Sequence, residues 1–89
     1  MANIEDEIAR GNRAAELLRS EILKEAFDKL QDYYVDAWIH TSMDETAKRE
    51  RLHISINVLS EIQEHLASVA MTGRMAADQI VAAKDDRYH

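Results

Sequence analysis

Residues 42–71 carry the pattern that most restricts the fold, because they predict one long helix with a wide apolar face. Apolar side chains recur at helical spacing along one side of it: Leu52, Ile56, Leu59, Leu66 and Ala70. A second set extends the same surface around the helix: Ile54, Val58, Ile62 and Val69. Together they cover roughly half the circumference, more than the ~100° stripe of an ordinary surface helix. One neighbouring helix cannot cover so broad a face, so we expect at least two packing partners.

Capping signals mark both ends of this helix. Ser42 and Glu45 have the spacing of a capping box, in which each side chain accepts a hydrogen bond from the other residue's backbone amide. Two acid-before-base pairs at four-residue spacing predict ion pairs in the first turns: Asp44–Lys48 and Glu45–Arg49. Gly73 predicts the stop, because glycine readily takes the left-handed conformation that closes a helix. We expect a short helix over residues 74–83 and a frayed polar tail over residues 84–89.

The segment before the long helix predicts two more helices. Asn3 can cap the first, whose apolar face also carries Gly11. A glycine inside a helix lowers its stability by ~1 kcal/mol relative to alanine. Either this helix is weak at Gly11 or a neighbour packs close to it, and we prefer close packing. Ser20 marks a break with a new cap, although one continuous helix from Asn3 to Ile39 is the alternative. The second helix has a stripe that we expect to be core: Ile22, Leu23, Ala26, Phe27, Leu30, Tyr33, Tyr34, Ala37 and Trp38.

These patterns predict a single small all-α domain spanning residues 1–89. The connection at residues 40–42 is short enough to require an antiparallel neighbour, so we expect an antiparallel helical hairpin with a long C-terminal helix. The N-terminal helix should pack across it. The absence of proline and the presence of only two glycines agree with this fold. The surplus apolar surface predicts a homo-oligomeric bundle with this interface: Ile54, Val58, Ile62, His65 and Val69.

The sequence argues against an enzyme. It has no cysteine, no glycine-rich phosphate loop and no assignable Ser/His/Asp order, and its paired carboxylates lie on expected solvent faces. His65 with Glu61 could suggest a metal site, but Ile62 occupies the position that the Glu-x-x-His motif of di-iron bundles requires. We therefore expect no catalytic residue, metal or cofactor.

The net charge of −6 disfavours binding to a phosphate backbone, so no nucleic-acid partner is expected. No apolar run approaches the ~20 residues of a membrane span, and the N-terminus does not have the pattern of a signal peptide. The expected location is the cytoplasm, or the outside of the cell after export by a non-standard route.

One basic group could bind a small anion. Arg10, Arg13, Arg19 and Lys24 flank the junction of the first two helices. In a symmetric oligomer, arginines from neighbouring chains could hold a ligand such as a nucleotide. The alternative is a solvated arginine face.

Two families share parts of this pattern. A helical hairpin with tryptophan beside its bend resembles the secreted WXG-type hairpins, but His40 replaces the glycine that their motif requires two residues after Trp38. The chain also resembles small proteins encoded by tailed bacteriophages. That likeness lies in residues 14–18, 23–27 and 49–52, in Tyr34, Ala37, Trp38, His65 and Leu66, and in Gly73. The resemblance implies phage origin and an accessory role, and it assigns no functional residue.

The leading hypothesis is a non-enzymatic, phage-encoded oligomeric accessory or assembly protein, associated with the virion or with packaging, in the infected host cell. The alternative is an anti-defence binding module that sequesters a nucleotide signal or blocks a host protein.

Overall fold

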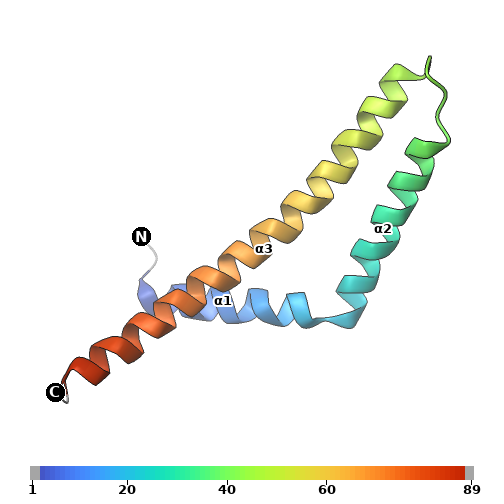
Figure 1. Cartoon of the computed structure of the whole chain (residues 1–89). Coiled ribbons are helices and arrows are strands. Elements are labelled where there is room, and N and C mark those ends of the chain that lie inside the picture. Colours follow the sequence, from blue (N-terminus) through green and yellow to red (C-terminus); the bar gives the residue numbers. More distant parts are fainter. Residues whose placement is uncertain (1–2, 88–89) are drawn as a thin grey trace. The chain divides into compact units, whose positions relative to one another are not determined.

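The computed structural model describes residues 3–87, and side chains are described through Lys84. Its elements are the helices α1 (Ile4–Arg19), α2 (Glu21–Ile39) and α3 (Thr46–Arg87), as Figure 1 shows. No strand forms within residues 3–87. The all-α prediction is therefore confirmed. The predicted tail is helical as far as Arg87, and its residues 88 and 89 lie outside the described part of the chain.

Local capping sets the first helix boundaries. The Asn3 Oδ1 atom accepts a hydrogen bond from the Asp6 amide at 2.8 Å, which satisfies an amide that has no partner inside α1. Ser20 has an extended backbone (φ −65°, ψ 119°), and its hydroxyl accepts from the Leu23 amide at 3.3 Å. The chain therefore breaks at Ser20, and the alternative of one continuous helix is wrong.

The capping box before α3 forms only in part. The Ser42 amide donates to Glu45 Oε1 at 2.9 Å, as predicted. The Glu45 amide, however, donates to the backbone oxygen of Ser42 at 3.1 Å instead of its hydroxyl. The Ser42 hydroxyl lies 2.6 Å from Asp44 Oδ1 and 3.1 Å from Glu45 Oε1. A tight turn thus precedes the helix, and α3 begins at Thr46 and not at Ser42.

Helix α3 is longer than the pattern predicted. It runs for 42 residues through Gly73 and includes the whole segment expected to form a separate helix. No residue in the described range, Gly73 included, has a positive φ. The predicted stop at Gly73 and the separate helix over residues 74–83 are therefore wrong. Gly73 is instead buried in the continuous helix, where it contacts α1.

The chain divides into two compact units, and α3 contributes to both. The first unit comprises Met1–Arg19 and His65–His89, so α1 packs on the second part of α3. The second unit is Ser20–Glu64, which contains α2 and the first part of α3.

The first unit is organised around a contact between two glycines. An ideal Cβ atom built on Gly11 would lie 2.6 Å from the Gly73 Cα atom and 3.2 Å from the backbone oxygen of Val69. Ala14 and Ala76 are each only 4% exposed. Because these positions have small side chains or none, the two backbones come into direct contact. The interpretation of Gly11 as a close-packing position is confirmed.

The second unit has little buried core. Leu59, at 8% exposed, is the one buried hydrophobic residue of this unit among the described residues. Helix α2 contributes no fully buried residue, and Tyr33 and Leu30 of its apolar stripe are exposed. The expectation that this stripe is core is met only in part, since Phe27 and Tyr34 are half-buried. Two helices alone cannot enclose side chains of this size.

Candidate functional site

An apolar groove runs between α2 and α3 in the second unit. Leu30 and Tyr34 supply one side, and Ile54, Val58 and Ile62 line the other, with Ser55 and Leu59 between them. The groove has a volume of about 330 Å³. Ile54, Val58 and Ile62 are 58%, 46% and 47% exposed, which leaves about half of each side chain in contact with water. We call this surface the apolar groove.

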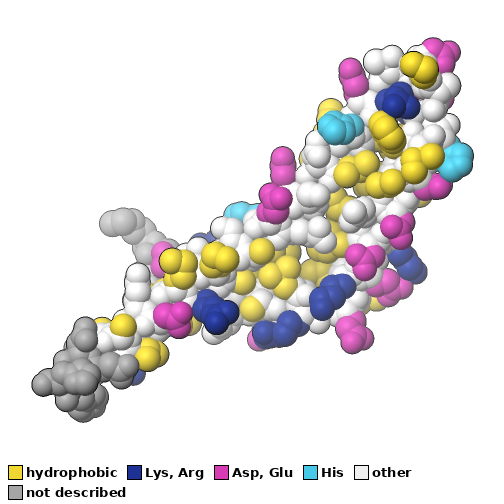
Figure 2. Space-filling model, viewed as in Figure 1, with side chains coloured by type: hydrophobic (Ala, Val, Ile, Leu, Met, Phe, Trp, Pro, Cys, Tyr) yellow, Lys and Arg dark blue, Asp and Glu magenta, His cyan; other side chains and the backbone are white. Residues whose placement is uncertain are grey.

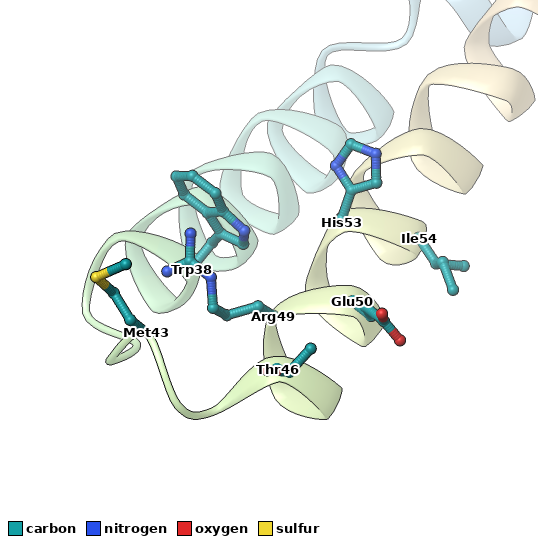
Figure 3. A pocket seen from close by; sticks show the side chains of 7 residues that line it. All are labelled: Trp38, Met43, Thr46, Arg49, Glu50, His53 and Ile54. Atoms are coloured by element: carbon teal, nitrogen blue, oxygen red, sulfur yellow. The ribbon is translucent and has the colours of Figure 1, made fainter.

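A larger pocket lies at the end of the second unit where α2 connects to α3. Its volume is about 470 Å³. Figure 3 shows the side chains that line it: Trp38, Met43, Thr46, Arg49, Glu50, His53 and Ile54. Hydrophobic side chains are open to solvent at this end of the unit (Figure 2). Because Ile54 lines both the pocket and the apolar groove, the two surfaces are continuous.

Arg49 contacts residues on both sides of this pocket at the α2–α3 connection. Its guanidinium carbon lies 4.4 Å from the centroid of the Trp38 ring, a cation–π contact (Figure 3). Its Nη1 atom donates to the Thr41 hydroxyl at 2.8 Å, and that hydroxyl donates to the Trp38 backbone oxygen at 2.6 Å. The predicted Glu45–Arg49 ion pair is absent from the described contacts, and Glu45 pairs with Lys48 at 3.8 Å. Arg49 thus ties the end of α2 to the first turn of α3.

The two carboxylates of the connection are held in their charged form. Hydrogen bonds from the Ser42 amide and hydroxyl lower the pKa of the Glu45 carboxyl. A hydrogen bond from the Ser42 hydroxyl is the largest of the causes that lower the pKa of Asp44. Both carboxyls are exposed, so these contacts act locally on the turn. This arrangement suits a rigid connection and offers no acid–base chemistry.

The five residues predicted as an interface divide between the units. Ile54, Val58 and Ile62 lie together along the apolar groove. His65 is exposed and belongs to the first unit. Val69 is half-buried in that unit, where its backbone oxygen lies close to α1 at Gly11. The groove therefore contains three of the five, together with two α2 residues.

The four predicted anion contacts do not line one site. Arg10 lines a recess of about 180 Å³ in the first unit, beside Glu7. Arg19 lines a different recess of about 470 Å³, together with Arg74. The remaining two, Arg13 and Lys24, are exposed, and Lys24 belongs to the second unit.

Sequence reasoning missed two features. The Trp38–Arg49 contact joins residues eleven apart across a connection whose conformation the helical pattern does not encode. The helical pattern does not point to Arg74, because this residue follows Gly73, the predicted end of the long helix. Arg74 is the residue after Gly73. Its position points to a site near α1 only once Gly73 is known to contact α1.

Within the described residues, no group of three or more His, Cys, Asp or Glu side chains could hold a metal ion. No helix in the described range is long and apolar enough to cross a membrane. Comparison of the chain with family models, curated proteins and solved structures finds no match in any of the three. Function is therefore inferred from the surfaces described above.

Proposed function

We propose that this chain is a non-enzymatic, oligomeric accessory or assembly protein that works through the apolar groove. One observation carries the proposal. The buried hydrophobic residues of the described chain are Ala14, Leu59 and Ala76, whereas many large hydrophobic side chains remain exposed. A chain with so little core of its own gains stability mainly by covering these side chains with another chain.

The physical argument rests on exposed apolar area. Soluble monomers rarely expose contiguous apolar patches larger than a few hundred Å². Each Å² that a partner covers contributes about 25 cal/mol. The proposed building block is an antiparallel hairpin of α2 and α3 with the N-terminal helix packed across α3. A second copy placed on the apolar groove would complete a four-helix bundle, in which α2 and the first part of α3 each gain a second neighbour.

The proposed biological setting is a tailed bacteriophage. Its support is the likeness to phage-encoded proteins along residues 14–18, 23–27 and 49–52. In this setting the protein acts in the infected host cell, on the virion or during packaging. Co-purification with virion components would support the assembly role, and its absence from virions and packaging complexes would count against it.

The test of self-association is the mass in solution. Light scattering at tens of micromolar should give a multiple of the 10.2 kDa chain mass. Val58→Glu places a charge on the groove and should reduce the mass to one chain while helical circular dichroism is retained. Ser60→Glu, at an exposed position outside the groove lining, is the matched control and should keep the oligomer. A monomeric wild-type protein would refute the proposal.

A second candidate function is favoured by the free basic residues. Among the described residues, the ion pairs join Lys29 to Glu25, His40 to Asp36 and Lys48 to Glu45. Four basic residues flank the α1–α2 junction and form no ion pair with a described acid: Arg10, Arg13, Arg19 and Lys24. Since they line no single site within one chain, these charges would have to come from neighbouring copies of an oligomer to form an anti-defence module that sequesters a nucleotide signal or blocks a host protein.

The sequestration function predicts a change in melting temperature when nucleotides are added. Nucleotides should raise the melting temperature, because a ligand that binds the folded state stabilises it by mass action. Arg10→Gln and Arg13→Gln should abolish the increase. The assembly function does not require a nucleotide effect, and under it Arg10→Gln and Arg13→Gln should leave the melting temperature with nucleotide unchanged.

A further inference from the structure

The larger recess of the first unit has the features of an anion site. It lies beside the Gly11–Gly73 contact, has a volume of about 470 Å³, and is lined by residues of both α1 and α3. We propose that this recess binds a small organic phosphate, with Arg19 and Arg74 on the phosphate. The inference goes beyond the assembly function, because it needs no second copy of the chain, and it differs from the sequestration function in using Arg74 in place of Arg10 and Arg13.

The recess follows from the small side chains around the helix contact. Ala15 on α1 and Ala70 and Ala77 on α3 extend only one carbon atom from the backbone, so they leave space beside the crossing. A volume of a few hundred Å³ is typical of sites for small organic ligands. The alanine methyl groups and Met71 supply an apolar surface for the body of the ligand.

The charge of the lining selects an anion. Arg19 and Arg74 line the recess with Asn12, and no carboxylate is among the lining residues. The acids nearest to them along their own helices are Glu16 and Asp78, but neither forms an ion pair with an arginine in the described contacts. The recess is thus cationic in a chain whose net charge is −6.

Two guanidinium groups favour a phosphate in particular. Each presents five N–H donors in a planar fork that matches two phosphate oxygens at once. The Asn12 amide adds a further donor at the same recess. The recess that Arg10 lines is smaller, at about 180 Å³, and includes the Glu7 carboxylate, which would repel an anion. The structure therefore favours Arg74, which the helical pattern did not suggest, over Arg10 as the partner of Arg19.

The test is a calorimetric titration of the full chain with phenyl phosphate, inorganic phosphate and phenol. Phenyl phosphate should bind saturably and about tenfold more tightly than inorganic phosphate, since it also covers the alanine surface. Phenol should show no saturable binding. Arg19→Gln and Arg74→Gln should each weaken phenyl phosphate binding at least about tenfold, as expected for loss of a charged hydrogen bond. Absence of saturable phenyl phosphate binding would overturn the proposal.

Two further variants separate this site from general attraction to positive charge. Arg13→Gln removes the same charge from an exposed position on α1 and should leave binding unchanged. An equal loss in Arg13→Gln and Arg19→Gln would overturn the assignment. Ala77→Leu fills the recess without altering its charge, so it should weaken phenyl phosphate more than inorganic phosphate. An equal affinity of wild type and Ala77→Leu for phenyl phosphate would also overturn it. Circular dichroism of each variant verifies that the helices are retained.

Discussion

Replacing Gly11 with alanine should destabilise the first unit, although alanine is the better helix former. The added Cβ atom would lie 2.6 Å from the Gly73 Cα atom, about 0.9 Å inside the ~3.5 Å at which two carbon atoms make a favourable contact. The other atoms within 3.2 Å are the Gly73 nitrogen and the Val69 backbone oxygen. Because all three are backbone atoms, no side chain can rotate away, and the helices must separate.

Two opposing terms set the size of this effect. Alanine in place of glycine contributes about 1 kcal/mol of helix propensity. Overpacking a closely packed contact costs typically 1–3 kcal/mol, and a contact between two backbones should lie toward the upper end of that range. The free energy of unfolding should therefore fall by about 1–2 kcal/mol. For a domain of this size, each kcal/mol corresponds to roughly 4–8 °C in melting temperature.

Thermal unfolding followed by circular dichroism, at one fixed protein concentration, measures the change. Amide hydrogen exchange should also become faster along α1. Asn12→Ala is the matched control, since it raises helix propensity at an adjacent exposed position and should leave the melting temperature equal or higher. A higher melting temperature in Gly11→Ala, with unchanged exchange along α1, would refute the close approach of the two helices.

Two other predictions concern the connection between α2 and α3. Because hydrogen bonds from Ser42 lower the folded-state pKa of Glu45, the turn is stabilised above the ordinary glutamate pKa of about 4.3, and this contribution is lost as the pH falls through the lowered value. Carboxyl NMR titration should show the lowered pKa, and an ordinary value would contradict the capping contact. Arg49→Ala removes the contacts with Trp38 and Thr41, so urea unfolding should show a loss of about 0.5–1 kcal/mol. Tryptophan emission should shift as well, and unchanged emission with unchanged stability would contradict the stacked geometry.

The starts of α1 and α2 were predictable, because each depends on a cap formed by neighbouring residues. The caps at Asn3 and Ser20 each join a side chain to an amide three residues later, and this spacing is visible in the sequence. The role of Gly73 was not predictable, since glycine can either end a helix or allow close packing. Only the position of α1 decides between these two roles.

The candidate sites were likewise predictable only where their residues lie on one helix. Helical periodicity placed Ile54, Val58 and Ile62 on one surface, and the structure confirms that they line one groove. It did not reveal the recess between Arg19 and Arg74, because these residues lie on different helices and are far apart in the chain.

The sequence by itself thus determined an all-helical chain and the shared apolar surface of Ile54, Val58 and Ile62 on α3, and it offered Ser20 as one of two possibilities for the path of the chain after α1. These features depend on interactions within a few residues or on the 3.6-residue repeat of a helix. The tertiary structure decided that α3 continues through Gly73 and that Arg19 and Arg74 line one recess. It also decided that Arg49 contacts the Trp38 ring and forms no ion pair with Glu45 in the described contacts. Each of these outcomes requires two helices to meet, and contacts between distant segments are not encoded in the local pattern of either one.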